Sequence, residues 1–271
     1  MSFKSFEGLS ALHRNTNHVI VSAHRGLSGS FPENTLLAMR KAIECGADII
    51  EFDLRMSKDG VPVVLHDATL NRTSDLEGKP EDLELAALRC GNFSYYRFGV
   101  DAASGKRLKI PAYEKMNIPS LEEVFQQFRG KVGMNIQVYA NDAGLVEVCR
   151  LYKAYQMYDQ GYLTIASLEA YETIRKIDAK IEICFTPAWN LRGSPEGLRQ
   201  CKELGCRFVQ PVVNYSGPDC YRLCRELGLR ANAFYVDTDL DIRLLLAQGA
   251  DGMLSNRPDI VRDSLLELGR Y

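Results

Sequence analysis

Two histidines stand beside a charged residue at the end of an apolar run, where they could move protons in a reaction. His24 is followed by Arg25 and comes soon after the β-branched residues 19–21. His66 is followed by Asp67 at the end of another apolar run. Imidazoles titrate near neutral pH, and a guanidinium binds phosphate through parallel hydrogen bonds. These residue types are typical of acid–base chemistry on an anionic substrate, although such a pair alone is more often a surface or capping feature.

Two carboxylates could hold a cation near these histidines. Glu51 and Asp53 lie two residues apart in the apolar segment 48–56. Side chains alternate across a strand, so both carboxylates point to the same side. Paired oxygen ligands suit a hard divalent cation, Mg²⁺ or Ca²⁺. Paired acids at a strand end are also often only solvated, so the argument depends on the joint order of the motifs.

Nine segments are expected to form strands, and most of them are followed by a helix-like segment with apolar spacing near 3.6 residues. They are residues 19–26, 48–56, 61–67, 134–140, 162–167, 181–187, 207–213, 229–237 and 251–256. Repeated strand–helix units predict a parallel sheet. The four residues 57–60 are too few for the crossover between parallel neighbours, so they predict a hairpin turn between the second and third segments.

Eight strand–helix units remain, and they predict an α/β fold of the (β/α)8 or TIM-barrel type. We expect one domain over residues 1–271, with an insertion at about residues 57–118. Active sites in such barrels lie at the carboxyl ends of the strands. His24 and Glu51 are therefore expected on the catalytic face, and His66 can bend back over the same mouth.

The composition favours a globular protein and gives no sign of nucleic-acid binding. The chain has 271 residues, a formal net charge of -2 and 46% hydrophobic residues, and no run of like charges predicts binding to nucleic acid. No apolar segment approaches the ~20 residues that span a bilayer, so no transmembrane segment is expected. The polar first eighteen residues do not resemble a signal peptide, and the eight cysteines contain no CxxC pair. We therefore expect a cytoplasmic protein with reduced thiols.

Seven short motifs follow one another along the chain. They are HRG at 24–26, PENT at 32–35, GAD at 46–48 before the ExD of 51–53, KDGVPVVLHD at 58–67, RT at 72–73, IPSLEEVF at 118–125 and GADGMLSNRPD at 249–259. As a set they closely resemble the glycerophosphodiester phosphodiesterase family, over roughly residues 19–262. The resemblance implies a metal-assisted hydrolase that splits a glycerophosphodiester into glycerol 3-phosphate and an alcohol.

The resemblance also implies roles for individual residues. His24 and His66 would be the acid/base pair, Glu51 and Asp53 would ligate the divalent cation, and Arg25 would bind the substrate phosphate. A cation and a guanidinium stabilise the charge that gathers on the phosphoryl oxygens in the transition state. Two histidines fit attack by water and attack by the 2-hydroxyl of the glycerol equally well.

One strand departs from the family pattern. The family's next metal strand reads Ile-Glu-Ile-Lys, whereas residues 134–140 read MNIQVYA. Gln137 stands in place of the third acidic ligand, and Tyr139 stands in place of a lysine near the phosphate. An amide oxygen can ligate a cation but is neutral, so we expect Gln137 to give weaker metal binding. Tyr139 can only hydrogen-bond or stack.

Two functions therefore stay open. The first is a working phosphodiesterase with altered metal ligation. The second is a catalytically impaired protein that binds phosphodiesters or sugar phosphates on the same barrel. For either, Phe234 is expected to line the substrate pocket, where the family commonly has tryptophan, and Trp189 could form a lip against the alcohol.

Overall fold

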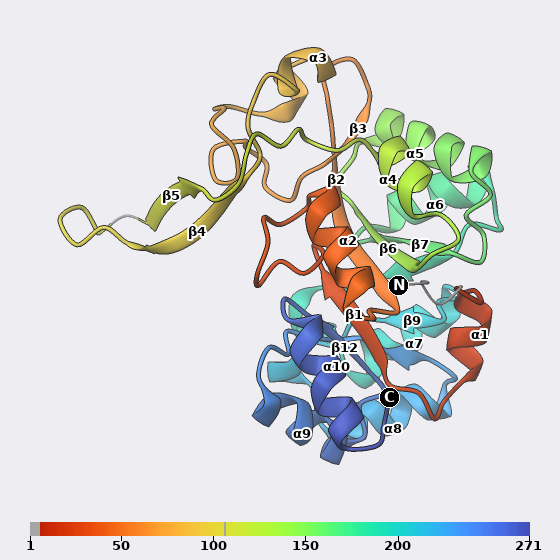
Figure 1. Ribbon diagram of the computed structural model, residues 1–271. Coiled ribbons are helices and arrows are strands. Elements are labelled where there is room, and N and C mark those ends of the chain that lie inside the picture. The colour runs from red at the N-terminus through yellow and green to blue at the C-terminus, as the bar shows by residue number, and fades with distance from the viewer. Residues whose placement is uncertain (1–5, 106) are drawn as a thin grey trace.

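Strands and helices alternate along the chain in this computed structural model, which describes residues 6–105 and 107–271 (Figure 1). The barrel strands are β1 (Ile20–His24), β2 (Ile49–Met56), β6 (Gly133–Val138), β7 (Gly161–Ile165), β8 (Ile183–Phe185), β9 (Phe208–Val209), β10 (Arg230–Ala231), β11 (Ala233–Phe234) and β12 (Gly252–Ser255). The helices around them are α1 (Leu9–Arg14), α2 (Leu36–Glu44), α4 (Leu121–Phe128), α5 (Asp142–Ala154), α6 (Leu168–Ile177), α7 (Pro195–Glu203), α8 (Pro218–Glu226), α9 (Asp239–Gln248) and α10 (Pro258–Glu267).

The barrel strands run parallel to one another. Seven pair in the order β11-β12-β1-β2-β6-β7-β8. β9 lies beside β8 and pairs with β10, and a parallel bridge from Val212 to Phe234 continues this link to β11. The predicted α/β barrel is confirmed. One detail of the prediction is wrong, because the segment expected as a single strand at 229–237 is interrupted at Asn232 into β10 and β11.

The inner face of the barrel changes from apolar to polar along the strands. Ile20, Ile49 and Phe208 belong to a buried apolar cluster near the amino-terminal ends, and Leu9 of α1 packs into it from below. Two and four residues further along β1 and β2, the same face carries polar side chains, among them His24 and Glu51. The apolar cluster therefore lies beneath the polar residues of the inner face.

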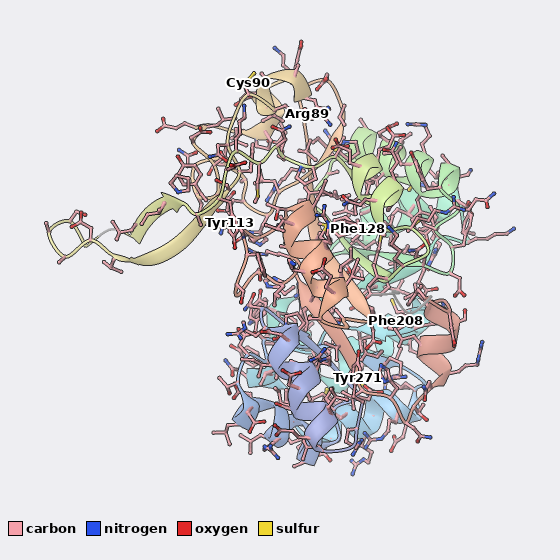
Figure 2. All side chains as sticks on the ribbon, in the orientation of Figure 1. Arg89, Cys90, Tyr113, Phe128, Phe208 and Tyr271 are labelled. Carbon is pink, nitrogen blue, oxygen red and sulfur yellow. The ribbon has the colours of Figure 1, made fainter. Side chains whose placement is uncertain are left out.

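The chain leaves the barrel between β2 and α4. β3 (Pro62–Val64) pairs antiparallel with β2, which confirms the predicted hairpin. It is followed by the 3₁₀ helix η1 (Pro80–Asp82), helix α3 (Leu85–Leu88) and the hairpin of β4 (Tyr95–Val100) and β5 (Arg107–Pro111). The sequence did not predict this second hairpin, which projects from the body (Figure 1). Figure 2 shows Tyr113 at its base, with Arg89 and Cys90 directly after α3, earlier in the inserted segment.

The helices are short. The longest of those described, α5, has 13 residues, and no helix within residues 6–105 and 107–271 has the length and apolar character to cross a membrane.

Arg230 connects residues 12–18, which precede β1, to the barrel by hydrogen bonds and an ion pair. Its side chain is 3% exposed and lies 2.8 Å from the carboxylate of Asp251. It donates hydrogen bonds to the backbone carbonyls of Leu12, Asn15 and His18. Loss of one partner of a buried ion pair leaves the other uncompensated, so we expect Arg230→Met to lower the free energy of unfolding by about 3–5 kcal/mol.

Urea denaturation measures this effect. Arg222→Met, at an exposed position on α8, is the matched control and is expected to change the free energy of unfolding by less than about 0.5 kcal/mol. An Arg230→Met protein as stable as this control would contradict the structural role of Arg230.

Candidate active site

The carboxyl ends of three neighbouring strands bring polar side chains together. In the strand register, His24 lies opposite Glu51, and Asp53 lies opposite Gln137. The His24 Nε2 atom is 4.0 Å from the carboxylate of Glu51. His24, Glu51 and Asp53 are all buried. The structure therefore places these four predicted site residues along one rim of the barrel.

Arg25 turns the chain at the end of β1 and reaches both acids. It adopts a φ of 55°, a left-handed conformation that is uncommon outside glycine, and its backbone N–H donates to Glu51 at 2.9 Å. Its Nε lies 3.2 Å from the carboxylate of Asp53, and its Nη1 donates to Glu33 at 2.8 Å. Gly26 follows with a φ of 78°, and a Cβ there would lie 2.5 Å from the backbone of Ala38. The HRG motif thus makes a turn that only glycine completes.

The PENT motif serves the helix and the site together. The Thr35 hydroxyl accepts from the Ala38 N–H and caps α2, as a helix N-cap does. Asn34, with a φ of 58°, instead donates from its amide to the Asp53 carboxylate at 2.9 Å. One short motif therefore starts the helix and fixes the orientation of a predicted metal ligand.

A chain of charged groups connects the two halves of the site. The Nδ1 of His66 lies 2.7 Å from Asp67, and Arg72 donates to Asp67 and to Glu33. Burial opposes ionisation of Glu33, but hydrogen bonds and charges from Arg72 and Arg25 outweigh it and lower its pKa to about 2. The hydrogen bond from Arg72 likewise holds the pKa of Asp67 below its usual range. Both carboxylates are therefore ionised at neutral pH, and His66 is held through Nδ1 with Nε2 left for reaction.

The orientation of His24 follows from a second chain of hydrogen bonds. Asp237 accepts hydrogen bonds from the side-chain amide of Asn256 at 2.6 Å and from its backbone N–H at 2.8 Å. The carbonyl oxygen of Asn256 therefore faces the Nδ1 of His24, at 2.7 Å. An amide oxygen can only accept, so His24 carries its proton on Nδ1 and presents Nε2 as a base. Burial lowers the pKa of His24 to about 3, so the ring is neutral at neutral pH.

The acidic pair is electrostatically unfavourable in the protein alone. Burial, followed by the charge of Asp53, raises the pKa of Glu51, and burial raises the pKa of Asp53 despite the charge of Arg25. The four acids at this rim and the two arginines paired with them are Glu33, Glu51, Asp53, Asp67, Arg25 and Arg72. Their formal charges leave two negative charges, which one divalent cation would neutralise.

The residues fit a divalent cation with two charged ligands. In the part of the chain that the structure describes, no group of three or more His, Cys, Asp or Glu side chains is spaced to hold a metal ion. A cation at Glu51 and Asp53 therefore needs neutral oxygens as well. Gln137 stands beside Asp53 and donates from its amide nitrogen to the Thr164 carbonyl at 3.5 Å, which leaves its amide oxygen for such a role.

Tyr139 lies where His66 and a guanidinium meet. Its ring is 5.8 Å from the His66 ring, edge to face, and the guanidinium of Arg55 lies 4.6 Å from its centroid. Arg55 also donates to the backbone carbonyl of His66 at 3.0 Å. Burial raises the pKa of the Tyr139 phenol, so it stays protonated. Arg55 thus brings a positive charge close to the position where the family has lysine.

Aromatic rings line the opposite side of the mouth. Tyr235 packs against His24 with ring centroids 4.6 Å apart, and Phe234 follows at 5.1 Å from Tyr235. Trp189 is half exposed and meets Phe234 edge to face at 5.5 Å. Phe234 stands where the family commonly has tryptophan, and Trp189 places an indole ring next to it.

Sequence reasoning missed several of these side chains. They are Glu33, Arg55, Arg72, Arg192, Tyr235, Asp237 and Asn256. Glu33, Arg72 and Asn256 lie inside motifs that the sequence analysis quoted, so a closer reading of those motifs could have found them. Asp237 ends a predicted strand, and Arg55 continues the alternation of Glu51 and Asp53 along one strand, whereas Arg192 carries no signal in its spacing.

A parallel barrel whose rim carries paired carboxylates, two histidines and guanidinium groups is typical of an enzyme of the phosphodiesterase class. A model of the glycerophosphoryl diester phosphodiesterase family matches residues 24–260. The chain belongs to this family, as its motifs predicted.

Individual relatives agree with this assignment. A glycerophosphodiester phosphodiesterase of Bacillus altitudinis is 37% identical over 252 residues, which are 88% of this chain and 95% of the relative. Another, from Caldanaerobacter subterraneus, is 28% identical over 247 residues, which are 89% of this chain and 95% of that relative. An Oleispira antarctica phosphodiesterase, solved in complex with the product sn-glycerol-3-phosphate, has the same fold with a TM-score of 0.77 at 22% identity, covering 91% of this chain and 96% of that chain.

Proposed function

We propose that this protein is a metal-dependent phosphodiesterase that hydrolyses glycerophosphodiesters to glycerol 3-phosphate and an alcohol. The observation that carries the proposal is that two histidines at one rim are held by hydrogen bonds in the same way. His24 and His66 each engage an acceptor through Nδ1, which leaves both Nε2 atoms for proton transfer. Family membership supports the same reaction.

The two histidines differ in their surroundings, and the difference assigns their roles. His24 is buried and neutral, so it serves as the base that takes the proton of the attacking hydroxyl. His66 is held through Nδ1, 2.7 Å from the carboxylate of Asp67, which orients the ring and leaves Nε2 for proton transfer to the leaving group. His66 therefore serves as the acid that protonates the leaving alkoxide. The carboxylate of Glu51 near the His24 Nε2 stabilises the charge that His24 gains.

Glu51 and Asp53, with the amide oxygen of Gln137, would hold the Mg²⁺ or Ca²⁺ ion. When bound, the cation polarises the phosphoryl oxygens and lowers the cost of charge in the transition state. Arg25 uses Nε and Nη1 toward Asp53 and Glu33, and its Nη2 makes no hydrogen bond within the described residues. We assign that Nη2 group to the substrate phosphate.

The cysteines support a reducing environment. All eight are free, and six of them are buried in the core. Buried thiols without disulfides are typical of cytosolic proteins, so the proposal includes a cytoplasmic location and a small-molecule substrate rather than nucleic acid.

A turnover assay tests the proposal directly. Purified protein is incubated with glycerophosphocholine, glycerophosphoethanolamine and glycerophosphoglycerol, each with Mg²⁺, Ca²⁺ or Mn²⁺, and released glycerol 3-phosphate is measured by a coupled dehydrogenase. We expect release from at least one diester that EDTA abolishes and added metal restores. No release above background under all of these conditions would contradict the proposed function.

The second candidate, a non-catalytic phosphodiester-binding protein, is favoured by Gln137 and Tyr139. These two residues remove a negative ligand and a positive charge from the family's site. For an active enzyme, we expect Gln137→Glu to lower the metal concentration for half-maximal activity about tenfold, because a third carboxylate strengthens cation binding. Metal titration of the activity measures this effect, with Gln126→Glu on α4 as the control. A wild-type protein without turnover that gains it in Gln137→Glu/Tyr139→Lys would establish the binding function instead.

A further inference from the structure

Arg192 is a partly buried guanidinium that no carboxylate neutralises. It lies after β8 and the 3₁₀ helix η2 (Trp189–Leu191), and its Nε donates to the Pro187 carbonyl at 3.2 Å. Among the described residues, no acidic side chain lies within ion-pair distance of it. Burial lowers its pKa. At Arg25 burial acts in the same direction, but the charges of Asp53 and Glu33 outweigh it and raise the pKa.

The position of Arg192 connects it to the candidate active site. Its guanidinium carbon lies 5.2 Å from the ring centroid of Trp189 and 5.8 Å from that of Phe234. From Phe234 the ring contacts continue through Tyr235 to His24. The phenols of Tyr139 and Tyr235 lie close enough to Arg192 to influence its pKa. It therefore stands over the same mouth as the catalytic rim, on the side opposite Arg25.

The charge balance of the site requires a further positive group for an anionic substrate. Arg25 and Arg72 are each paired with two carboxylates, so much of their charge is already compensated. A divalent cation would neutralise the remaining acids but would leave little positive charge for an anionic substrate. The family's lysine, which would supply it, is Tyr139 here. Arg192 and Arg55 are both cations at this mouth without an acid within ion-pair distance among the described residues, but Arg55 already donates to the His66 carbonyl through two nitrogens and lies over the Tyr139 ring.

We propose that Arg192 binds the phosphate group of the glycerophosphodiester substrate and of the glycerol 3-phosphate product. From the loop after β8, it adds a positive charge on the opposite side of the mouth from Arg25, at a site where Tyr139 stands in place of the family's lysine. Trp189 and Phe234 hold the guanidinium by cation–π contacts without neutralising it. This assignment rests on the proposed function, because it places the phosphate of that reaction at this mouth.

Equilibrium binding tests the inference without turnover. Glycerol 3-phosphate and inorganic phosphate are titrated into the metal-loaded protein by calorimetry, and the fluorescence of Trp189, the only tryptophan, is followed in parallel. Loss of a hydrogen bond to a charged group weakens binding about 10- to 100-fold, and we expect this for Arg192→Gln. Arg192→Lys keeps the charge and is expected to restore part of the affinity. Arg199→Gln, an exposed arginine on α7, is the matched control and should bind as wild type does.

Kinetics with several head groups separate a phosphate contact from a head-group contact. If Arg192 binds the phosphate, Arg192→Gln lowers kcat/KM by the same factor for glycerophosphocholine, glycerophosphoethanolamine and glycerophosphoglycerol. A loss confined to one head group would overturn the assignment, and so would unchanged glycerol 3-phosphate affinity in a variant with a wild-type melting temperature. A wild-type protein that binds glycerol 3-phosphate through Arg192 but never turns over would leave this inference standing and remove only the proposed function.

Discussion

Replacement of His24 by alanine is expected to lower kcat by about 10²–10⁴-fold, because it removes the base that takes the proton of the attacking hydroxyl. Its melting temperature should stay close to that of the wild type, since the ring contributes one hydrogen bond and one ring contact to the fold. Steady-state assays of glycerol 3-phosphate release measure the loss. Partial recovery on addition of imidazole would show that the missing group is the base itself.

The same variant has a pH signature. Burial lowers the pKa of His24 to about 3, so in the free enzyme this base keeps its active, neutral form far below the usual histidine value of 6.5. The acidic limb of kcat/KM that His24 governs should therefore lie well below pH 6.5. A limb near 6.5 that disappears in His24→Ala would contradict the buried, neutral state of the ring.

Replacement of Asn256 tests the hydrogen bond that the Nδ1–H of His24 donates. Asn256→Asp exchanges an amide oxygen for a carboxylate against His24 and sets it beside Asp237, which favours a protonated ring. The variant should move the acidic limb of kcat/KM toward higher pH, whereas His24→Ala removes that limb altogether. An unchanged profile in Asn256→Asp would mean that this hydrogen-bond chain does not control the base.

The sequence predicted the barrel because two separate patterns mark its strands and their directions. β-Branched runs alternate with helical segments, and the short turn at 57–60 excludes a parallel crossover. The break at Asn232 was not foreseeable, because the segment 229–237 is continuously strand-like and only tertiary pairing divides it. The β4–β5 hairpin was missed for a related reason. It projects from the body, so its residues do not show the regular alternation that burial of one face imposes.

The candidate site also contains residues that the sequence predicts and residues that it does not predict. His24, Glu51 and Asp53 were predictable because strand alternation fixes where a residue at a strand end points. Arg192 was not, because a long side chain on a loop reaches the site through a path that spacing does not encode. The partners of His24 were hidden for another reason, since Asp237 and Asn256 come from the ends of β11 and β12, far from His24 along the chain.

Replacement of Glu51 by glutamine should separate catalysis from stability. Burial, followed by the charge of Asp53, raises the pKa of Glu51 from its usual value of 4.5. Above pH 4.5 the unfolded chain loses this proton while the native protein without metal retains it, so the native state binds more protons and its stability falls as pH rises. Glutamine keeps the acceptor for the Arg25 N–H and removes the ionisable group. Without metal, the variant should therefore melt about 2–4 °C above the wild type at neutral pH, with a smaller difference near pH 4.5.

Divalent metal should reverse this order. Cation binding to Glu51 and Asp53 stabilises the wild type by mass action, whereas Glu51→Gln loses one of two charged ligands. We expect saturating Mg²⁺ or Ca²⁺ to raise the wild-type melting temperature and to leave that of the variant nearly unchanged, while activity falls by at least about 100-fold. Calorimetric melting at several pH values, with and without metal, measures both effects, and Glu44→Gln on the exposed end of α2 is the control. A variant that is less stable than the wild type without metal would mean that Glu51 stabilises the fold, which would remove the electrostatic reason for placing a cation against it.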